Sequence, residues 1–350
     1  MMSSLSHPNS SWLAPSIAAA ILAVASACRP GDRSVPKASD ASAATESMGA
    51  AVEVVRDVSS RARLELVEGS AAVMSEQQPG VLFTINDSGH DPYLYAIDTL
   101  GADRGAWRVT KARDVDWESL SQGTCGGDKA DSSPARDERP VDGDACLYIG
   151  DTGDNEATRR SRTIYRVREP VVGDSSFTGV VRAERVDYRY ADEAHDVEAM
   201  YVAPNGAIRL ITKRKLKGPN GTLRPALVFS IDAPAWNRGD TVVAALVDSL
   251  PIVPGSAPLR WITDASLTRD GKRLAVRTYV QLYVFETDSA TGLVRHDVTP
   301  TTCNLEALDE ETGEGVSWLP GSDLLVLTRE GERTPLLIVR CPSVPTPARR

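Results

Sequence analysis

Residues 116–120 read Asp-Trp-Glu-Ser-Leu, and four similar units occur elsewhere in the chain. Each unit carries an acidic residue followed by small residues and an apolar stretch, and a turn and a second short apolar run come next. The other four units are Val67-Glu68-Gly69-Ser70-Ala71, Asp196-Val197-Glu198-Ala199-Met200, Thr263-Asp264-Ala265-Ser266-Leu267 and Glu314-Gly315-Val316-Ser317-Trp318. A repeat of this kind predicts a closed ring of similar β-units with carboxylates gathered at its centre.

Short apolar or alternating runs separated by Gly, Pro and Asn turns dominate the sequence after residue 60, which indicates an all-β fold. The runs fall into groups of four, and the first group comprises residues 70–75, 81–85, 93–98 and 106–110. About 40–50 residues and four strands per unit are typical of a β-propeller blade. We predict a propeller of five four-stranded antiparallel blades, with six as the alternative. A β-sandwich would explain the alternation but not the recurring acidic unit.

The last group supplies three clear strands before the chain approaches Cys341. We therefore expect Arg61–Val67, at the start of the domain, to provide the fourth strand and close the ring. The predicted domain spans residues 57–345, with a polar insert at 126–145.

The first 28 residues resemble a bacterial lipoprotein signal peptide. A mostly apolar segment ends in Ala25-Ser26-Ala27-Cys28, and small residues before a cysteine precede the lipidated position of such signals. The alternative is a secretory signal cleaved after Ala25 or Ala27. Residues 29–56 are rich in Ser, Ala, Pro and Asp and are expected to form a flexible tether.

These features predict an exported monomer that is either a cell-envelope lipoprotein or secreted, and that contacts a membrane only through a lipid on Cys28. The formal net charge of -9 over 350 residues argues against a general nucleic-acid binder. If Cys28 carries lipid, four cysteines remain, and an even number in an exported chain favours two disulfides. Three pairings are possible, and we prefer Cys125–Cys146 and Cys303–Cys341.

In a propeller, the start of each innermost strand and the end of the next strand lie on the same face. The acidic units occupy the first position, and two polar clusters, Asn86–Gly89 and Gly150–Asn155, occupy the second. We therefore expect one acidic mouth built from Asp116, Glu118, Asp196, Glu198, Asp264 and Glu314, with Asn86, Asp87, Asp151 and Asp154 close by.

Lys213, Arg277 and Arg329 each follow an apolar run at a similar offset, and they are expected to lie beside the carboxylates. Crowded carboxylates need neutralisation, either by Ca²⁺, which prefers oxygen ligands, or by these cations. Both possibilities stay open. The candidate metal ligands are Asp151, Asp154, Asp196 and Glu198, and the candidate ligand-binding residues are Asn86, Asp87, Asp116, Glu314 and Arg329.

The order of these motifs resembles a group of secreted bacterial β-propeller proteins that is broadly similar to NHL-type and phytase-like propellers. The resemblance spans roughly residues 60 to 340, and the insert at 126–145 departs from it. Propellers of this broad kind include calcium-dependent phosphoesterases and lactonases, sugar-processing hydrolases and non-catalytic binders, so the fold does not choose between these functions.

Two functions are therefore expected. The first is a non-enzymatic, envelope-anchored protein that binds a small molecule, a protein or Ca²⁺ at the mouth. The second is a calcium-dependent hydrolase acting on a phosphoester, lactone or glycoside. Its candidate catalytic residues are Glu118, Glu198, Asp264, Lys213 and Arg277, and His90 or His195 are candidate bases.

Overall fold

The computed structural model describes residues 49–342, except for residues 61, 64, 127–143, 214–224, 233, 235, 253–259, 311 and 334. The described residues are joined into β-strands and include the short 3-10 helix η2 (Glu306–Leu308), but no α-helix. None of them forms a helix that is long and apolar enough to cross a membrane. The predicted signal peptide, most of the predicted tether and most of the insert lie outside the described residues.

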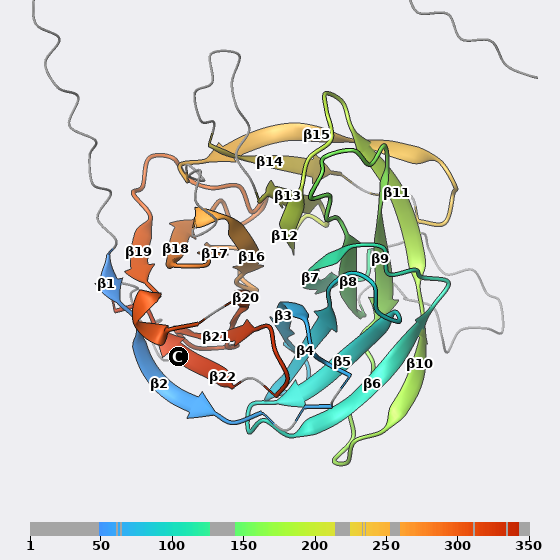
Figure 1. The fold of residues 1–350 in the computed structure, drawn as a ribbon. Helices are drawn as coiled ribbons and strands as arrows, with labels where there is room; N and C mark the ends of the chain where they lie inside the picture. The colour runs from blue at the N-terminus through green and yellow to red at the C-terminus, as the bar shows by residue number, and fades with distance from the viewer. Residues whose placement is uncertain are drawn as a thin grey trace, which may run out of the picture. The chain divides into compact units, whose positions relative to one another are not determined.

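The strands form four hydrogen-bonded sheets (Figure 1). The first sheet has the order β10-β6-β5-β4-β3, and its strands are β3 (Gly69–Met74), β4 (Val81–Asn86), β5 (Tyr93–Asp98), β6 (Asp103–Thr110) and β10 (Thr178–Arg182). The fourth has the order β2-β22-β21-β20, with β2 (Glu53–Val58), β20 (Gly313–Trp318), β21 (Leu324–Arg329) and β22 (Leu336–Arg340).

The third sheet has the order β1-β19-β18-β17-β16. Its strands are β1 (Ala50–Ala51), β16 (Ile262–Leu267), β17 (Arg273–Thr278), β18 (Gln281–Glu286) and β19 (Thr301–Asn304). These sheets are antiparallel except where β10 joins β6 and β1 joins β19, and both of those pairs are parallel.

The second sheet contains eight strands and consists of two four-stranded groups. One group is β7 (Trp117–Thr124), β8 (Ala145–Asp151), β9 (Arg162–Arg168) and β11 (Glu184–Tyr190). The other is β12 (Val197–Val202), β13 (Ile208–Thr212), β14 (Ala226–Ile231) and β15 (Thr241–Leu250). Parallel pairing of the outer strands β11 and β15 joins the two groups into one sheet.

The innermost strands of the five groups are β3, β7, β12, β16 and β20, and they lie around a common centre (Figure 1). Each contacts the next in this order, and β20 contacts β3, so the described strands close a ring. The described residues also form five hydrophobic clusters, each between two neighbouring groups of strands. This is a β-propeller, as the repeat predicted.

Burial between neighbouring sheets explains why many strands are continuous apolar runs rather than alternating ones. All six residues of β4 are buried, for example, and so are all six of β12. Outer strands such as β11 alternate in exposure because one of their faces is solvated. The apolar runs therefore identified the inner three strands of each group most reliably.

An N-terminal strand closes the ring, as predicted, but it is not the segment that was expected. The strand that completes the last group is β2, whose residue Val54 pairs with Val339 of β22. Arg61–Val67 forms no strand among its described residues, so its assignment as the closing strand was wrong. β2 also begins at Glu53, inside the stretch expected to be a tether. Its residues are mostly exposed, so its sequence lacks the apolar run by which the other strands were found.

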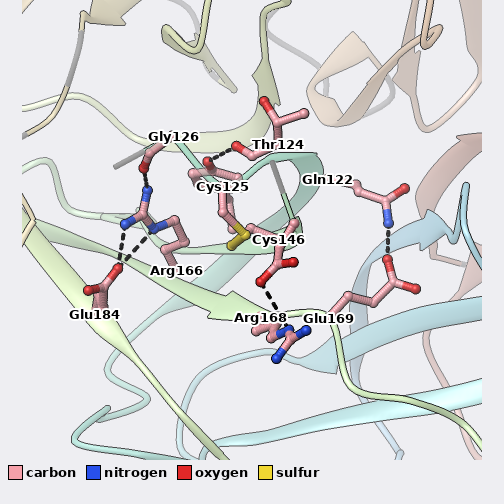
Figure 2. The surroundings of a disulfide bond; sticks show 11 residues. Gln122, Thr124, Cys125, Gly126, Cys146, Arg166, Arg168, Glu169 and Glu184 are labelled. Atoms are coloured by element: carbon pink, nitrogen blue, oxygen red, sulfur yellow. Dashed lines mark hydrogen bonds and ion pairs between the residues drawn. A yellow bond between two sulfur atoms is a disulfide. The ribbon is translucent and has the colours of Figure 1, made fainter. Parts of the chain in front are cut away.

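The structure contains both predicted disulfides, Cys125–Cys146 and Cys303–Cys341. The first joins the end of β7 to β8, and Figure 2 shows Arg166 beside it, donating to the Gly126 carbonyl and pairing with Glu184. The second joins β19 to the residue that follows β22, so it fastens the fourth group of strands to the fifth.

Candidate functional site

Each inner strand has a β-bulge near its start, where the register to the next strand shifts. The residues skipped at these shifts are Ser70, Glu118, Glu198, Thr263 and the pair Glu314–Gly315. A bulge redirects the side chain of the extra residue. The acidic repeat of the sequence therefore corresponds to a repeated bulge, and in three of five positions the bulged residue is glutamate.

The three bulged glutamates are buried, and each has a different polar partner. Glu118 Oε2 accepts a hydrogen bond of 2.7 Å from Ser70 Oγ, which occupies the equivalent bulge of the preceding strand group. Glu198 forms an ion pair with Lys213. Glu314 accepts a side-chain hydrogen bond from Tyr279. The mouth therefore contains several carboxylates in different hydrogen-bonding environments.

Lys213 is the cation at the centre of this group. It follows β13, is 8 % exposed and pairs directly with Glu198. Its positive charge also opposes the rise in the pKa of both Glu118 and Glu314. The expected position of Lys213 beside the carboxylates therefore agrees with the structure.

Asp87, Asp116 and Glu118 form the tightest carboxylate cluster. One oxygen atom from each lies within 4.8 Å of the other two. Asp87 follows β4, Asp116 precedes β7 and Glu118 lies within β7, so two neighbouring strand groups contribute. Among the described residues this cluster has the donor set and spacing to hold a metal ion.

Gly153 allows the neighbouring loop to lie directly against this cluster. A Cβ atom at Gly153 would be 2.6 Å from Asp116 Cγ and 2.7 Å from Glu118 Cγ, which is closer than non-bonded carbon atoms approach. The Gly153 backbone N–H also donates to the Asp116 carbonyl at 3.2 Å. Any side chain at this position would displace the two carboxyl groups.

Burial and neighbouring charges raise the pKa values of three carboxyl groups at the mouth, those of Asp116, Glu118 and Glu314. The pKa of Asp116 rises to about 6, chiefly through burial and then through the charge of Asp87, while Arg159 acts in the opposite direction. Burial, followed by the charge of Asp87, raises the pKa of Glu118 well above its usual value. Burial likewise raises the pKa of Glu314 to about 8, against the opposing charge of Lys213. The mouth thus retains protons near neutral pH that a bound cation would replace.

Asp151 and Asp154 hold the loop that carries Gly153. Asp151 pairs with Arg159 at 2.6 Å and accepts the Asp116 backbone N–H at 3.2 Å. Asp154 accepts the backbone N–H groups of Thr158 at 2.9 Å and Arg159 at 2.8 Å, and it pairs with the buried Arg162. The direct role of these two aspartates as metal ligands stays a prediction.

Asp196 and Asn86 also bind backbone groups. Asp196 Oδ1 accepts the Asp154 N–H at 2.9 Å. Asn86 accepts the N–H groups of Val67 and Glu68 at 3.2 Å each, and it donates to the Glu65 carbonyl at 2.6 Å. Asn86 thereby holds the segment that leads into β3. Its expected role in ligand binding stays a prediction.

Asp264 joins inner strands to one another. Its carboxylate accepts backbone N–H groups from Ala72 of β3 at 3.3 Å, from Val316 of β20 at 2.8 Å and from Ala265 at 2.7 Å. The side chain is fully buried, and burial raises its pKa. These contacts connect β16 to β3 and to β20. We therefore include Asp264 in the scaffold and not in the proposed cation site.

Arg277 and Arg329 were expected at equivalent positions, but they lie one register position apart, because Arg277 is opposite the residue after the bulge and Arg329 is opposite the residue before it. Arg277 pairs in register with Asp264, and Arg329 pairs with Gly313. The Arg277 guanidinium is fully buried and donates to two carbonyls at 2.8 Å and to Glu310 at 2.5 Å. Because Arg277 does not reach the surface, it is poorly placed to hold a substrate. Arg329 is partly exposed, and its expected role in ligand binding stays a prediction.

The two histidines near the mouth have different surroundings. His90 Nε2 lies 2.8 Å from a Glu68 oxygen and is partly exposed. His195 is 1 % exposed, and its ring packs against Tyr190 and Phe229, with 4.7 Å between ring centroids in each case. Aromatic packing therefore determines the position of His195.

The sequence did not identify Ser70, Gly153, Tyr279 or Glu330 as parts of the mouth. Ser70 occupies the same place in the repeat as Glu118, which is a usable signal. Glu330 directly follows Arg329, and the charges of Asp87 and Glu68 reinforce the burial that raises its pKa. Tyr279 lies beyond the end of β17, where only the fold brings it to Glu314.

No protein-family model and no curated protein sequence matches the chain significantly. Solved propeller structures are similar at low identity. Glutaminyl cyclase from Myxococcus xanthus is 16 % identical with a TM-score of 0.42, covering 83 % of this chain and 96 % of its own. The PQQ-bound aldose sugar dehydrogenase from Streptomyces coelicolor is 10 % identical, with a TM-score of 0.42 and coverage of 83 % and 98 %. The propeller domain of Myceliophthora thermophila Swd1 is 14 % identical with a TM-score of 0.36, covering 82 % and 99 %. At these values the similarities carry no inference about function.

Proposed function

We propose that this protein is an exported β-propeller that binds Ca²⁺ at its acidic mouth. The observation that carries the proposal is the approach of Asp87, Asp116 and Glu118, whose oxygen atoms lie within 4.8 Å of one another. Three carboxylates offer only oxygen ligands, which is the donor set that Ca²⁺ prefers. The likeness of the motifs to phytase-like propellers, a broad group with calcium-dependent members, supports this choice of ion.

The raised pKa values of Asp116 and Glu118 also support cation binding. Burial is the main cause that raises the pKa of each group, and the charge of Asp87 is the second. A divalent cation would relieve the repulsion from Asp87, and it would release protons on binding. Cation affinity is therefore expected to increase with pH.

The test is the thermal unfolding midpoint of the wild type and of Glu118→Gln, with and without millimolar CaCl₂. Glutamine matches the shape of a protonated glutamate, so the variant is expected to fold. We expect Ca²⁺ to raise the midpoint of the wild type by several degrees and that of Glu118→Gln by much less. Equal shifts in the two proteins would contradict the proposal, as would the absence of any shift in the wild type.

Glu286→Gln is the matched control. Glu286 is an exposed glutamate at the end of β18, where it pairs with Arg295 at 3.0 Å. The substitution is chemically the same but lies away from the mouth. This variant is expected to keep the full Ca²⁺ response, and a reduced response would show that the ion acts through general surface charge.

Export and lipid anchoring form a second part of the proposal. Two disulfides are typical of oxidising compartments, and the small residues before Cys28 match a lipoprotein signal. In a bacterial host, the wild type is expected to enter the detergent phase on detergent partitioning, while Cys28→Ser stays in the aqueous phase. If the wild type and Cys28→Ser both stayed in the aqueous phase, the anchoring proposal would be wrong and secretion without a lipid anchor would be favoured.

A metal-dependent hydrolase is the second candidate function. The specific observation in its favour is that the mouth combines a carboxyl group of raised pKa, Glu314 at about 8, with the ion pair between Glu198 and Lys213. A carboxyl group that keeps its proton near neutral pH is suited to act as a general acid. Calcium-dependent hydrolysis of a phosphoester, lactone or glycoside that disappears in both Glu118→Gln and Glu198→Gln would support it, and no turnover across these classes would exclude them.

A further inference from the structure

A cavity of about 630 Å³ lies at the opposite ends of the inner strands from the carboxylate cluster. All five inner strands contribute to its wall, and the residues at or near their ends are Met74, Gln122, Val202, Leu267 and Trp318. Glu118 and Gln122 are four residues apart on β7, which places the two regions roughly 13 Å apart along the strand. The cavity is thus separate from the proposed cation site.

The wall of the cavity is mainly apolar because its hydroxyl groups serve the backbone of neighbouring strands. Ser121 Oγ accepts the N–H of Val202 at 3.1 Å, Ser317 Oγ accepts that of Met74 at 2.8 Å, and Ser266 Oγ accepts that of Trp318 at 3.2 Å. The remaining wall includes small and aliphatic side chains, among them Val73, Leu120 and Ala265. Apolar walls with few polar groups are typical of small-molecule sites of this size.

Arg273 is the charged group of the wall that the rest of the protein leaves incompletely satisfied. Its guanidinium lies over the Trp318 ring, 4.4 Å from the centroid. Nη1 is buried and has no hydrogen-bond partner among the described residues, and Nη2 makes only a long contact of 3.5 Å to the Ser322 carbonyl. Arg273 is nevertheless partly exposed and lines the cavity, so an anion there would accept from the accessible part of its guanidinium.

The acidic residues near Arg273 have other partners. Asp323 pairs with Arg340 at 3.2 Å, and Asp270 lies 3.8 Å from Lys272. Glu76, on the wall of the cavity, pairs with Arg269 at 3.3 Å. Burial lowers the pKa of Arg273, against the opposing charges of Asp270 and Asp323. The wall carries two acidic side chains, Glu76 and Asp270, and two basic ones, and Arg273 is the basic one that stacks on Trp318.

We propose that this cavity binds a small carboxylic acid with an apolar body, its carboxylate accepting from the accessible edge of the Arg273 guanidinium and its apolar part lying against Val73, Leu120 and Val202. The stacked guanidinium is held in place by Trp318, so little side-chain freedom remains to be lost on binding. Arg269 and Glu76 form an ion pair at the wall, so together they add no net charge to the cavity.

The test uses decanoate and decanol as probes, because they share an apolar chain and differ in the charge of the head group. Binding to the full-length protein is measured by calorimetry, with Trp fluorescence as a second readout. We expect decanoate to bind roughly tenfold more tightly than decanol, as one charge-assisted hydrogen bond would give. Equal affinities, tighter binding of decanol, or no binding of either probe would overturn the proposal.

Arg273→Gln removes the charge and keeps a hydrogen-bond donor. This variant is expected to bind decanol as the wild type does and to lose the preference for decanoate, while Arg295→Gln, an exposed arginine on another surface, keeps it. An unchanged preference in Arg273→Gln would contradict the assignment. If that variant does not fold, the comparison of the two probes on the wild type still decides the question. Repeating it in Glu118→Gln shows whether the cavity works independently of the cation site.

Discussion

Gly153 is the residue on which the geometry of the acidic mouth depends most directly. Its missing Cβ leaves room for the Asp116 carboxyl group and the Glu118 Cγ methylene, which would otherwise lie 2.6 Å and 2.7 Å from that atom. Its φ is not in the left-handed region, so close packing, and not backbone conformation, requires glycine here. The mouth is therefore sensitive to the smallest possible side chain at this position.

Gly153→Ala is expected to lower the free energy of unfolding by about 1–3 kcal/mol, because the extra methyl group overpacks the site. It should also abolish most of the stabilisation by Ca²⁺, since the carboxyl groups must move apart. Urea unfolding with and without Ca²⁺ measures both effects. Gly126→Ala is the control, because a Cβ there meets nothing within 4 Å; a loss of equal size in both variants would contradict the steric argument.

The raised pKa values of the mouth predict how stability changes with pH. A carboxyl group whose pKa is higher in the folded state binds more protons when folded, so its contribution is present at low pH and is lost as pH rises through the folded value. The folded pKa is about 6 for Asp116 and about 8 for Glu314. The stability that these groups contribute is therefore lost between about pH 4 and pH 8.

Without divalent cations, the free energy of unfolding contributed by these groups is therefore expected to fall across that range. Ca²⁺ should reduce the fall, because it replaces the protons as pH rises. Urea unfolding at several pH values checks this, and Glu118→Gln should show a shallower dependence than Glu286→Gln. A contribution that increases from pH 5 to pH 8 in the absence of cations would show that the pKa shifts have the opposite sign.

At the scale of the element, the sequence revealed the inner strands far better than the outer ones. β4 and β5 were predicted within one residue because their apolar runs are bounded by turn residues, and β5 was expected at residues 93–98. β2, β10 and β15 were missed or misplaced, since their exposed faces remove the apolar signal. The repeated acidic residues indicated where the bulges lie. The sequence of one strand, however, does not show which side chains of other strands its residues contact.

The Cys303–Cys341 disulfide joins elements of two neighbouring strand groups and is expected to stabilise the closed ring. Its loss in the double variant Cys303→Ser/Cys341→Ser should lower the free energy of unfolding by about 2–4 kcal/mol, because the unfolded chain gains freedom. Denaturant unfolding of the variant and of the reduced wild type measures this. Cys125→Ser/Cys146→Ser provides the comparison within a single strand group. No difference between oxidised and reduced wild type would contradict a stabilising role.

At the scale of the whole domain, the two ends of the ring carry different chemistry. The mouth with Asp87, Asp116 and Glu118 suits a cation, and the cavity with Arg273 suits an anion. The scaffold residue Asp264 of β16 accepts hydrogen bonds from β3 and β20, and it thereby connects strands of the inner ring. The five-strand ring thus supports two proposed sites without sharing a side chain between them.

Because the two sites share no residue, Ca²⁺ and decanoate are expected to stabilise the protein independently. The increase in the unfolding midpoint with both ligands present should equal the sum of the separate increases, within experimental error. Differential scanning calorimetry with each ligand and with both checks this. A combined shift clearly different from the sum would show that occupancy of one end changes the other.

The pairing of β2 with β22 sets the order in which this fold can be completed during biosynthesis. Val54 is made early and Val339 late, so β2 has no partner strand until almost the entire domain has been translated. At ordinary ribosome speeds that wait is on the order of tens of seconds. An unpaired strand edge is open to wrong partners in that interval, and the exposed charged residues of β2, including Glu53, Arg56 and Asp57, oppose such association. The polar residues that prevented the prediction of β2 from the sequence are therefore also expected to protect the nascent chain from aggregation.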